Sequence, residues 1–175
     1  MDDAHDGEAV AAVRAALADA ARRLAESGAR DEALAVYVPR GRKLLIPREP
    51  VLRPVGRVWR LGVLLLDAAG DLHATGRLVR ATPPGRGQYI SLSAETRRAL
   101  RAAAERGHFT PGETVNFDAA PIEVSVEGLR DAPGPLFLRD GRVLVRWSAT
   151  SPNAVEVASY LAERVELLTH PPEGA

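Results

Sequence analysis

Cysteine is absent from this 175-residue chain. Without it the protein can form no disulfide, no thiolate nucleophile and no zinc or iron–sulfur site that needs sulfur ligands. Aromatic residues make up only 5% of the chain, so we expect a core of leucine, valine and alanine. No apolar run approaches the roughly 20 residues that span a bilayer, and no signal peptide is recognisable. These absences predict a soluble, cytoplasmic protein.

Lysine is nearly missing as well, because Lys43 is the one lysine among 23 basic residues. The formal net charge is zero, which argues against general nucleic-acid binding, since such proteins usually carry a clear positive excess. The charges are nevertheless uneven. They sum to −4 over residues 1–38, +9 over residues 39–106 and −5 over residues 107–175.

Apolar residues at helical spacing predict three helices. The first lies within residues 1–28, and its predicted buried stripe is Val10, Val13, Leu17, Ala21 and Leu24. The second is expected over Ala94–Arg106, capped by Ser93 and closed by Gly107. Its predicted inner face is Thr96, Ala99, Leu100 and Ala103. The third is expected over residues 151–168, where Ser151-Pro152 is a typical helix start. Its predicted buried stripe is Ala154, Val157, Leu161, Val165 and Leu168.

The strands are predicted from apolar runs between turn residues. Residues 39–57 hold four prolines and many arginines, which predicts an extended connector with one short strand at Lys43–Ile46. The segment Val58–Arg80 is interpreted as a hairpin, with Leu61–Leu66 as one continuous strand and Leu72–Arg80 as the return strand. Further strands are expected at 34–38, 115–117 and 122–126.

Asp140-Gly141 is the strongest hairpin signal in the chain. Aspartate and glycine both tolerate the positive φ that a two-residue type I′ turn needs. Such a turn would pair Leu138 with Val143 and Leu136 with Val145. The flanking strands are therefore expected at 135–139 and 142–147.

Together these elements predict a single α+β domain with an antiparallel sheet packed by about three helices. The order of elements lacks the strict βαβ alternation of a doubly wound fold. Along the single domain 1–175 we expect an N-terminal helix (1–28), the Pro/Arg-rich connector (39–57), mostly strands with one helix (58–147) and a C-terminal helix (151–168).

No motif for a metal or a cofactor is present. The Walker pattern and the Rossmann glycine fingerprint do not occur, and the four histidines are scattered singly. Asp2, Asp3, His5 and Asp6 cluster at the N-terminus, where carboxylates favour the dipole of the first helix. The sequence therefore predicts no metal site and no cofactor.

One catalytic constellation can be drawn from Ser91, His108 and Glu113. Such a group would make the protein a small Ser/Thr-His hydrolase of the amidase type, with Ser91 or a threonine as nucleophile. None of the serines stands in a nucleophile-elbow context, and Ser93 and Ser151 are explained as helix caps. The hydrolase is therefore kept as an alternative.

Positive charge is concentrated over residues 39–60, which comprise the connector and the three residues after it. This segment contains seven basic residues and a single acidic residue, Glu49. Arginine is suited to bidentate contacts with carboxylates. We expect Arg40, Arg42, Arg57 and Arg60 to bind an acidic partner, a protein or a ligand.

Three segments carry a family resemblance: Val58–Asp67 followed by Ala74-Thr75-Gly76, then Gly112–Val115, and finally Tyr160–Leu168. They are similar to those of an uncharacterised family of small actinobacterial proteins, some of which carry the label "glutaminase". The resemblance covers most of the chain after residue 38. It implies no catalytic residues at particular positions.

Glutamine hydrolysis needs an activated Cys, Ser or Thr nucleophile. Cysteine is absent, and the Ser-x-x-Lys pair is missing because Arg40 stands three residues before Lys43. The preferred hypothesis is therefore a non-enzymatic interaction module whose Arg-rich middle binds an acidic partner. The hydrolase and a structural homodimeric subunit remain as alternatives.

Overall fold

The computed structural model describes residues 2–43, 46–83, 92–148 and 153–171. Helices and strands are mixed, and most strand pairs are antiparallel, so the α+β prediction is confirmed. Contacts divide the chain into two compact units. Unit 1 comprises Met1–Asp31, Val58–Thr75 and Ala120–Ala175, and unit 2 comprises Glu32–Arg57 and Gly76–Ala119. The expectation of a single domain, with its partition, stays a prediction.

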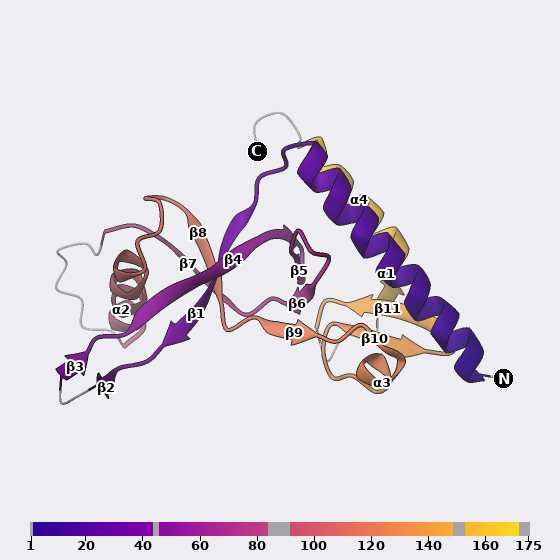
Figure 1. The fold of residues 1–175 in the computed structure, drawn as a ribbon, viewed down its shortest axis with the longest axis horizontal. Helices are drawn as coiled ribbons and strands as arrows, with labels where there is room; N and C mark the ends of the chain where they lie inside the picture. Colours follow the sequence, from indigo (N-terminus) through magenta and orange to yellow (C-terminus); the bar gives the residue numbers. More distant parts are fainter. Residues whose placement is uncertain (1, 44–45, 84–91, 149–152, 172–175) are drawn as a thin grey trace. The chain divides into compact units, whose positions relative to one another are not determined.

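Unit 2 is a sheet covered by one helix. Its strands follow the order β7-β8-β1-β4. Their bounds are Arg77–Arg80 for β7, Thr114–Phe117 for β8, Glu32–Val38 for β1 and Val51–Leu61 for β4. Only the first part of β4, up to Arg57, belongs to this unit. β1 and β8 run parallel, whereas β7 and β8 are antiparallel. Helix α2 (Leu92–Arg106) packs on β7 (Figure 1). The core between them is aliphatic with one phenylalanine: Ala33, Ala35, Leu52, Val79, Ala81, Ala103, Ala104, Val115 and Phe117.

The connector within unit 2 differs from the prediction of one short strand at Lys43–Ile46. β2 (Gly41–Lys43) and β3 (Ile46–Arg48) form an antiparallel pair in which Lys43 lies opposite Ile46. The predicted strand therefore corresponds to the end of one strand and the start of the next. Proline does not prevent this, because short, peripheral strands tolerate a missing amide donor.

Unit 1 is built around two long helices. α1 (Asp2–Glu26) and α4 (Val157–Thr169) pack side by side (Figure 1). The second part of β4 continues through β5 (Leu64–Leu66), β6 (Leu72–Ala74) and β9 (Ala120–Ile122). A separate sheet has the order β10-β11-β12, over Leu136–Arg139, Arg142–Arg146 and Ala154–Glu156. The short helix α3 spans Val126–Leu129. Among the described residues no helix is both long and apolar enough to cross a membrane.

The first helix and the Asp140-Gly141 hairpin confirm their predictions. All five residues of the predicted α1 stripe are buried in the core of unit 1. Leu138 pairs with Val143 and Leu136 with Val145. Asp140 and Gly141 have φ of +50° and +68°, as a type I′ turn requires. Both features depend on neighbouring residues alone, which is why the local sequence predicts them.

The predicted continuous strand Leu61–Leu66 is wrong. The chain reverses at Gly62-Val63, so that β4 and β5 pair antiparallel with Leu61 opposite Leu64. Gly62 has a φ of +65°, which a glycine adopts without steric cost. The predicted return strand is also divided, because β6 ends at Ala74 in unit 1 and β7 begins at Arg77 in unit 2.

The predictions for the ends of three other elements need correction. Helix α4 begins at Val157, because residues 154–156 extend the sheet as β12 and pair with β11. The predicted cap Ser151 lies outside the described residues.

The strand expected at 122–126 ends at Ile122, and Ser125 caps α3 by accepting a hydrogen bond from the Gly128 amide (2.9 Å). Helix α2 begins at Leu92, before the expected cap Ser93. Its buried face holds Ala103 and Ala104, whereas Thr96 and Ala99 are exposed.

Candidate functional site

Charge is segregated between the two units. Unit 2 contains thirteen basic and six acidic residues, a net charge of +7, and unit 1 contains ten basic and seventeen acidic residues, a net charge of −7. A protein of zero net charge therefore presents one basic and one acidic body. A concentrated charge of one sign attracts partners of the opposite sign over a distance of about one Debye length, roughly 8 Å at physiological salt.

The outer face of α2, the helix described in unit 2, is strongly basic. Arg97, Arg98 and Arg101 are exposed. Arg101 follows Arg97 by four residues and Arg98 by three, so its side chain neighbours both on the helix. None of the three forms an ion pair with a residue that the structure describes. Like charges at this spacing destabilise a helix slightly, so the arrangement does not arise from helix stability. The inner face predicted for this helix did not include these three arginines, and the structure shows them exposed.

The last arginine of α2 has a structural role. Arg106 donates a hydrogen bond from Nε to the Pro50 carbonyl oxygen (2.6 Å), which attaches the helix end to the segment before β4. Gly107 fits against the start of β4 itself, since a Cβ there would overlap the Leu52 carbonyl oxygen. The helix is therefore fixed at its C-terminal end, and its three outer arginines are presented on a rigid support.

The four arginines predicted as a partner site divide between the units. Arg40 forms an ion pair with Glu49 at 2.6 Å, and both side chains are largely exposed. Arg57 pairs with the partly buried Glu113. Arg42 lies on β2 opposite Pro47, and its side chain is outside the described residues. Arg60 belongs to unit 1, where it lies half-buried opposite Leu65 of β5. Unit 2 therefore collects Arg40, Arg42 and Arg57 but not Arg60, and their role in binding a partner stays a prediction.

Three further arginines of the unit 2 strands are exposed. Arg48 on β3, Arg53 on β4 and Arg80 on β7 form no ion pair with a described residue. Arg77 differs, because its guanidinium lies over the Phe117 ring at 5.0 Å and approaches the Asp118 carboxylate at 3.6 Å. Among the described side chains of unit 2, the exposed arginines without an ion pair or hydrogen bond are therefore Arg48, Arg53, Arg80 and the three outer arginines of α2.

The candidate hydrolase residues are not assembled in the part of the chain that the structure describes. His108 follows α2 as an exposed residue with a φ of +58°, and its side chain makes no hydrogen bond to any described residue. The Glu113 carboxylate is occupied by Arg57 and by the Thr110 amide (3.0 Å). Ser91 lies outside the described residues. His108 and Glu113 thus have local structural explanations.

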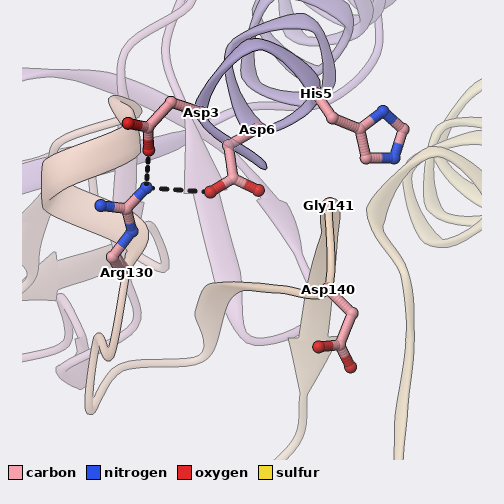
Figure 2. Close-up of a pocket in the computed structure, with 6 residues that line it drawn as sticks. All are labelled: Asp3, His5, Asp6, Arg130, Asp140 and Gly141. Carbon is pink, nitrogen blue, oxygen red and sulfur yellow. Dashed lines mark hydrogen bonds and ion pairs between the residues drawn. The ribbon is translucent and has the colours of Figure 1, made fainter. Parts of the chain in front are cut away.

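The N-terminal acidic cluster lines a depression of about 650 Å³ in unit 1, shown in Figure 2. Arg130 donates hydrogen bonds from Nη2 to Asp3 (2.8 Å) and to Asp6 (2.9 Å). Both bonds raise the pKa of the Arg130 guanidinium above its ordinary value, and the bond to Asp6 contributes most. The His5 ring lies against Gly141, away from Arg130. The cluster therefore joins α1 to the residue that follows α3.

The described residues contain no group of three His, Asp or Glu side chains placed to hold a metal ion. The two tryptophans differ in environment. Trp59 is buried and donates a hydrogen bond to the Ala29 carbonyl oxygen (3.0 Å), whereas Trp147 is 48% exposed and lies edge-on to Tyr160.

The outer arginines of α2, Arg97, Arg98 and Arg101, are accordingly the strongest candidate binding surface of the basic unit 2. The chain matches no protein-family model, no curated protein and no solved structure.

Proposed function

We propose that the protein is a non-enzymatic interaction module whose basic unit 2 binds an acidic protein. The observation that carries this proposal is the charge of +7 on unit 2 beside −7 on unit 1. Grouping like charges in one folded unit raises its self-repulsion, so a fold gains no stability from it. Grouped positive charge does help a surface to bind an acidic partner, because electrostatic complementarity speeds association and selects the partner.

The proposal differs from the sequence-based hypothesis in the residues that lead it. Arg40 and Arg57 have internal partners in Glu49 and Glu113, so an incoming carboxylate would have to compete with these. The α2 arginines have no such competitor among the described residues. We therefore place Arg97, Arg98 and Arg101 at the centre of the binding surface, with Arg40 and Arg42 as peripheral contributors.

An acidic protein fits this surface better than nucleic acid does. The negatively charged unit 1 is part of the same chain, and it would repel a long phosphate backbone. A partner protein can instead present its carboxylates locally. We place this interaction in the cytoplasm, and membership of the small actinobacterial family stays a prediction.

The experiment that tests the proposal is binding to poly-L-glutamate at pH 7 and low salt. The variant Arg97→Gln/Arg98→Gln/Arg101→Gln removes three charges from unit 2, and glutamine keeps nearly the same helix propensity as arginine. The matched control Arg22→Gln/Arg30→Gln/Arg142→Gln removes three charges from exposed arginines of unit 1.

We expect the α2 variant to bind poly-L-glutamate about tenfold more weakly than wild type, since each exposed ion pair contributes roughly 0.5 kcal/mol. The unit 1 control should stay within about twofold of wild type, because its arginines lie on the acidic body. Equal weakening in both variants would show that only net charge matters and would contradict a site on unit 2. Circular dichroism and cooperative unfolding of both variants confirm that they are folded.

A further inference from the structure

The sheet β10-β11-β12 of unit 1 has one face in the hydrophobic core and one face turned away from it. Leu136, Leu138 and Val145 lie in the core together with residues of α1 and α4. Side chains alternate along a strand, so Phe137 and Arg146 belong to the opposite face. On that face an aromatic ring and arginine side chains come together.

Two arginines pack on the Phe137 ring. The guanidinium carbon of Arg146 lies 4.6 Å from the ring centre, and that of Arg139 lies 5.1 Å from it. Phe137 is only 5% exposed, yet it belongs to neither hydrophobic core of the described residues. Positive groups are attracted to the face of an aromatic ring, so the two arginines shield this ring in place of a core.

The charge of Arg146 has no acidic partner among the described residues. Arg146 is half-buried and donates from Nε to the Gly134 carbonyl oxygen (3.0 Å) and from Nη2 to the Ala132 carbonyl oxygen (2.8 Å). These bonds hold the guanidinium in place, but a carbonyl oxygen carries no net charge. The N–H groups of Nη1 donate to no described residue, so Arg146 can still bind an anion.

Arg139 brings a second uncompensated charge to the same ring. It is exposed, follows Phe137 by two residues on β10 and forms no ion pair with a described residue. Arg142, which lies directly opposite Arg139 on β11, does have a partner, since it approaches Glu156 at 3.7 Å. Two guanidinium groups at one ring repel each other, and an anion bound to both would offset this repulsion.

Both arginines line one depression of about 220 Å³. Its lining also includes the apolar residues Pro133 and Phe137 and the acidic residue Asp131. Sites for drug-sized ligands are larger, roughly 300–1,000 Å³, so this depression fits a smaller molecule. A ligand there would meet two positive charges, one negative charge and apolar walls.

We propose that this depression binds a small monocarboxylate with a short apolar body. The carboxylate accepts hydrogen bonds from Arg139 and Arg146, because a planar guanidinium matches the geometry of a carboxylate. The apolar body lies against Pro133 and Phe137, where it is removed from water. The site belongs to unit 1 and is independent of the α2 surface of unit 2.

The charges of the lining favour a monoanion. Arg139 and Arg146 are positive and Asp131 is negative, and Asp131 forms an ion pair with neither arginine. The lining therefore carries a net charge of +1, which one carboxylate neutralises. A phosphate group carries roughly −1.5 to −2 at neutral pH and would leave an excess of negative charge beside Asp131.

The test is a titration of the isotope-labelled full chain with butyrate, followed by NMR at pH 7 and constant ionic strength. Butyrate combines a carboxylate with a short apolar body. Butyramide has nearly the same shape without the charge, and inorganic phosphate has the charge without the apolar body. The readouts are the backbone amide signals of residues 131–146 and the Nε–H signal of Arg146.

We expect butyrate to shift these signals with a dissociation constant on the order of 1 mM, because contacts with exposed charges are weak in water. Butyramide and phosphate should each bind at least about fivefold more weakly. Arg139→Gln should weaken butyrate binding about fivefold, the effect of losing one exposed ion pair. The matched control Arg142→Gln should stay within about twofold of wild type, because Arg142 is paired with Glu156.

Asp131→Asn provides a change of the opposite sign. It removes the negative charge from the lining, and asparagine tolerates the positive φ of +57° at this position. We expect butyrate to bind about twofold more tightly to this variant. The control Glu163→Gln removes the same charge from the exposed side of α4, which packs on the other face of the sheet, and should leave binding unchanged.

Four results would overturn the inference. The first is the absence of shifts at residues 131–146 with about 20 mM butyrate, well above the expected dissociation constant. The second is equal binding of butyramide and butyrate, and the third is tighter binding of phosphate than of butyrate. The fourth is equal weakening by Arg139→Gln and Arg142→Gln, which would show that only the charge of the sheet face matters. Amide spectra of the free variants that match wild type outside the changed residues show that the variants are folded.

Discussion

The hydroxyl of Tyr160 occupies the space where a side chain at Gly62 would begin. It donates a hydrogen bond to the Leu61 carbonyl oxygen (2.7 Å) and accepts one from the Val63 amide (3.0 Å), so it binds the residues on both sides of Gly62. A Cβ at Gly62 would overlap this hydroxyl, and the backbone there has a positive φ. The reversal between β4 and β5 is therefore fixed to α4 by a single buried side chain.

The first prediction concerns this contact. Gly62→Ala should lower the free energy of unfolding by at least about 2 kcal/mol, because it combines left-handed backbone strain with overlap in a packed site. Tyr160→Phe should cost about 1–3 kcal/mol, since the Leu61 carbonyl and the Val63 amide lose their partner. Chemical denaturation measures both.

The double variant provides the control for this prediction. Phenylalanine removes the oxygen that a Cβ at position 62 would meet, so Gly62→Ala should cost less in the Tyr160→Phe background than in wild type. Strict additivity of the two changes would contradict a direct contact between the two residues.

The second prediction concerns the Asp140-Gly141 turn. Gly141→Ala should cost about 1–2 kcal/mol, because a residue with a Cβ is strained at positive φ. A Cβ there would also meet the His5 ring, but this ring is the end of a side chain that can rotate away. The cost measured by denaturation should therefore be nearly the same in a His5→Ala background. A cost that disappears with His5→Ala would show that the contact dominates.

The third prediction distinguishes Gly107 from His108 at the end of α2. His108, not the glycine, has the positive φ (+58°), whereas Gly107 is required by its approach to the Leu52 carbonyl oxygen. Gly107→Ala should lower the free energy of unfolding by at least about 2 kcal/mol. His108→Gly should change it by less than about 1 kcal/mol, since relief of strain and greater freedom of the unfolded chain oppose each other. The reverse order of the two effects would contradict the structure.

The elements that the sequence predicts well are those held by residues close together along the chain. The stripe of α1 and the register around Asp140-Gly141 follow from periodicity and from turn chemistry alone. The reversal at Gly62 escaped prediction because the residue that stabilises it, Tyr160, lies about a hundred positions away. The apolar run Leu61–Leu66 gives no local sign that it divides into two strands.

The candidate site could be predicted only in part for the same reason. The positive middle of the chain was visible as a charge count, and much of it falls in unit 2. The pairing of Arg57 with Glu113, 56 residues apart, could not be seen in the sequence. Arg60 was grouped with Arg57 because they are neighbours along the chain, yet β4 carries the two into different units.

A fourth prediction concerns catalysis. The purified protein should release ammonia from glutamine no faster than a buffer control, because the sequence lacks every nucleophile arrangement considered for this reaction. An ammonia assay over several hours measures this. Sustained release that a single serine or threonine substitution abolishes would contradict the interaction-module proposal and support the hydrolase.

The central claim is that a neutral chain presents one basic and one acidic body. The most direct test is the retention of the protein on two ion exchangers at pH 7 and about 20 mM salt, where screening is weak. We predict that wild type is retained on both the cation exchanger and the anion exchanger, and that Arg97→Gln/Arg98→Gln/Arg101→Gln loses retention on the cation exchanger alone. A wild-type protein that passes through both columns unretained, as an evenly charged neutral protein does, would contradict the account.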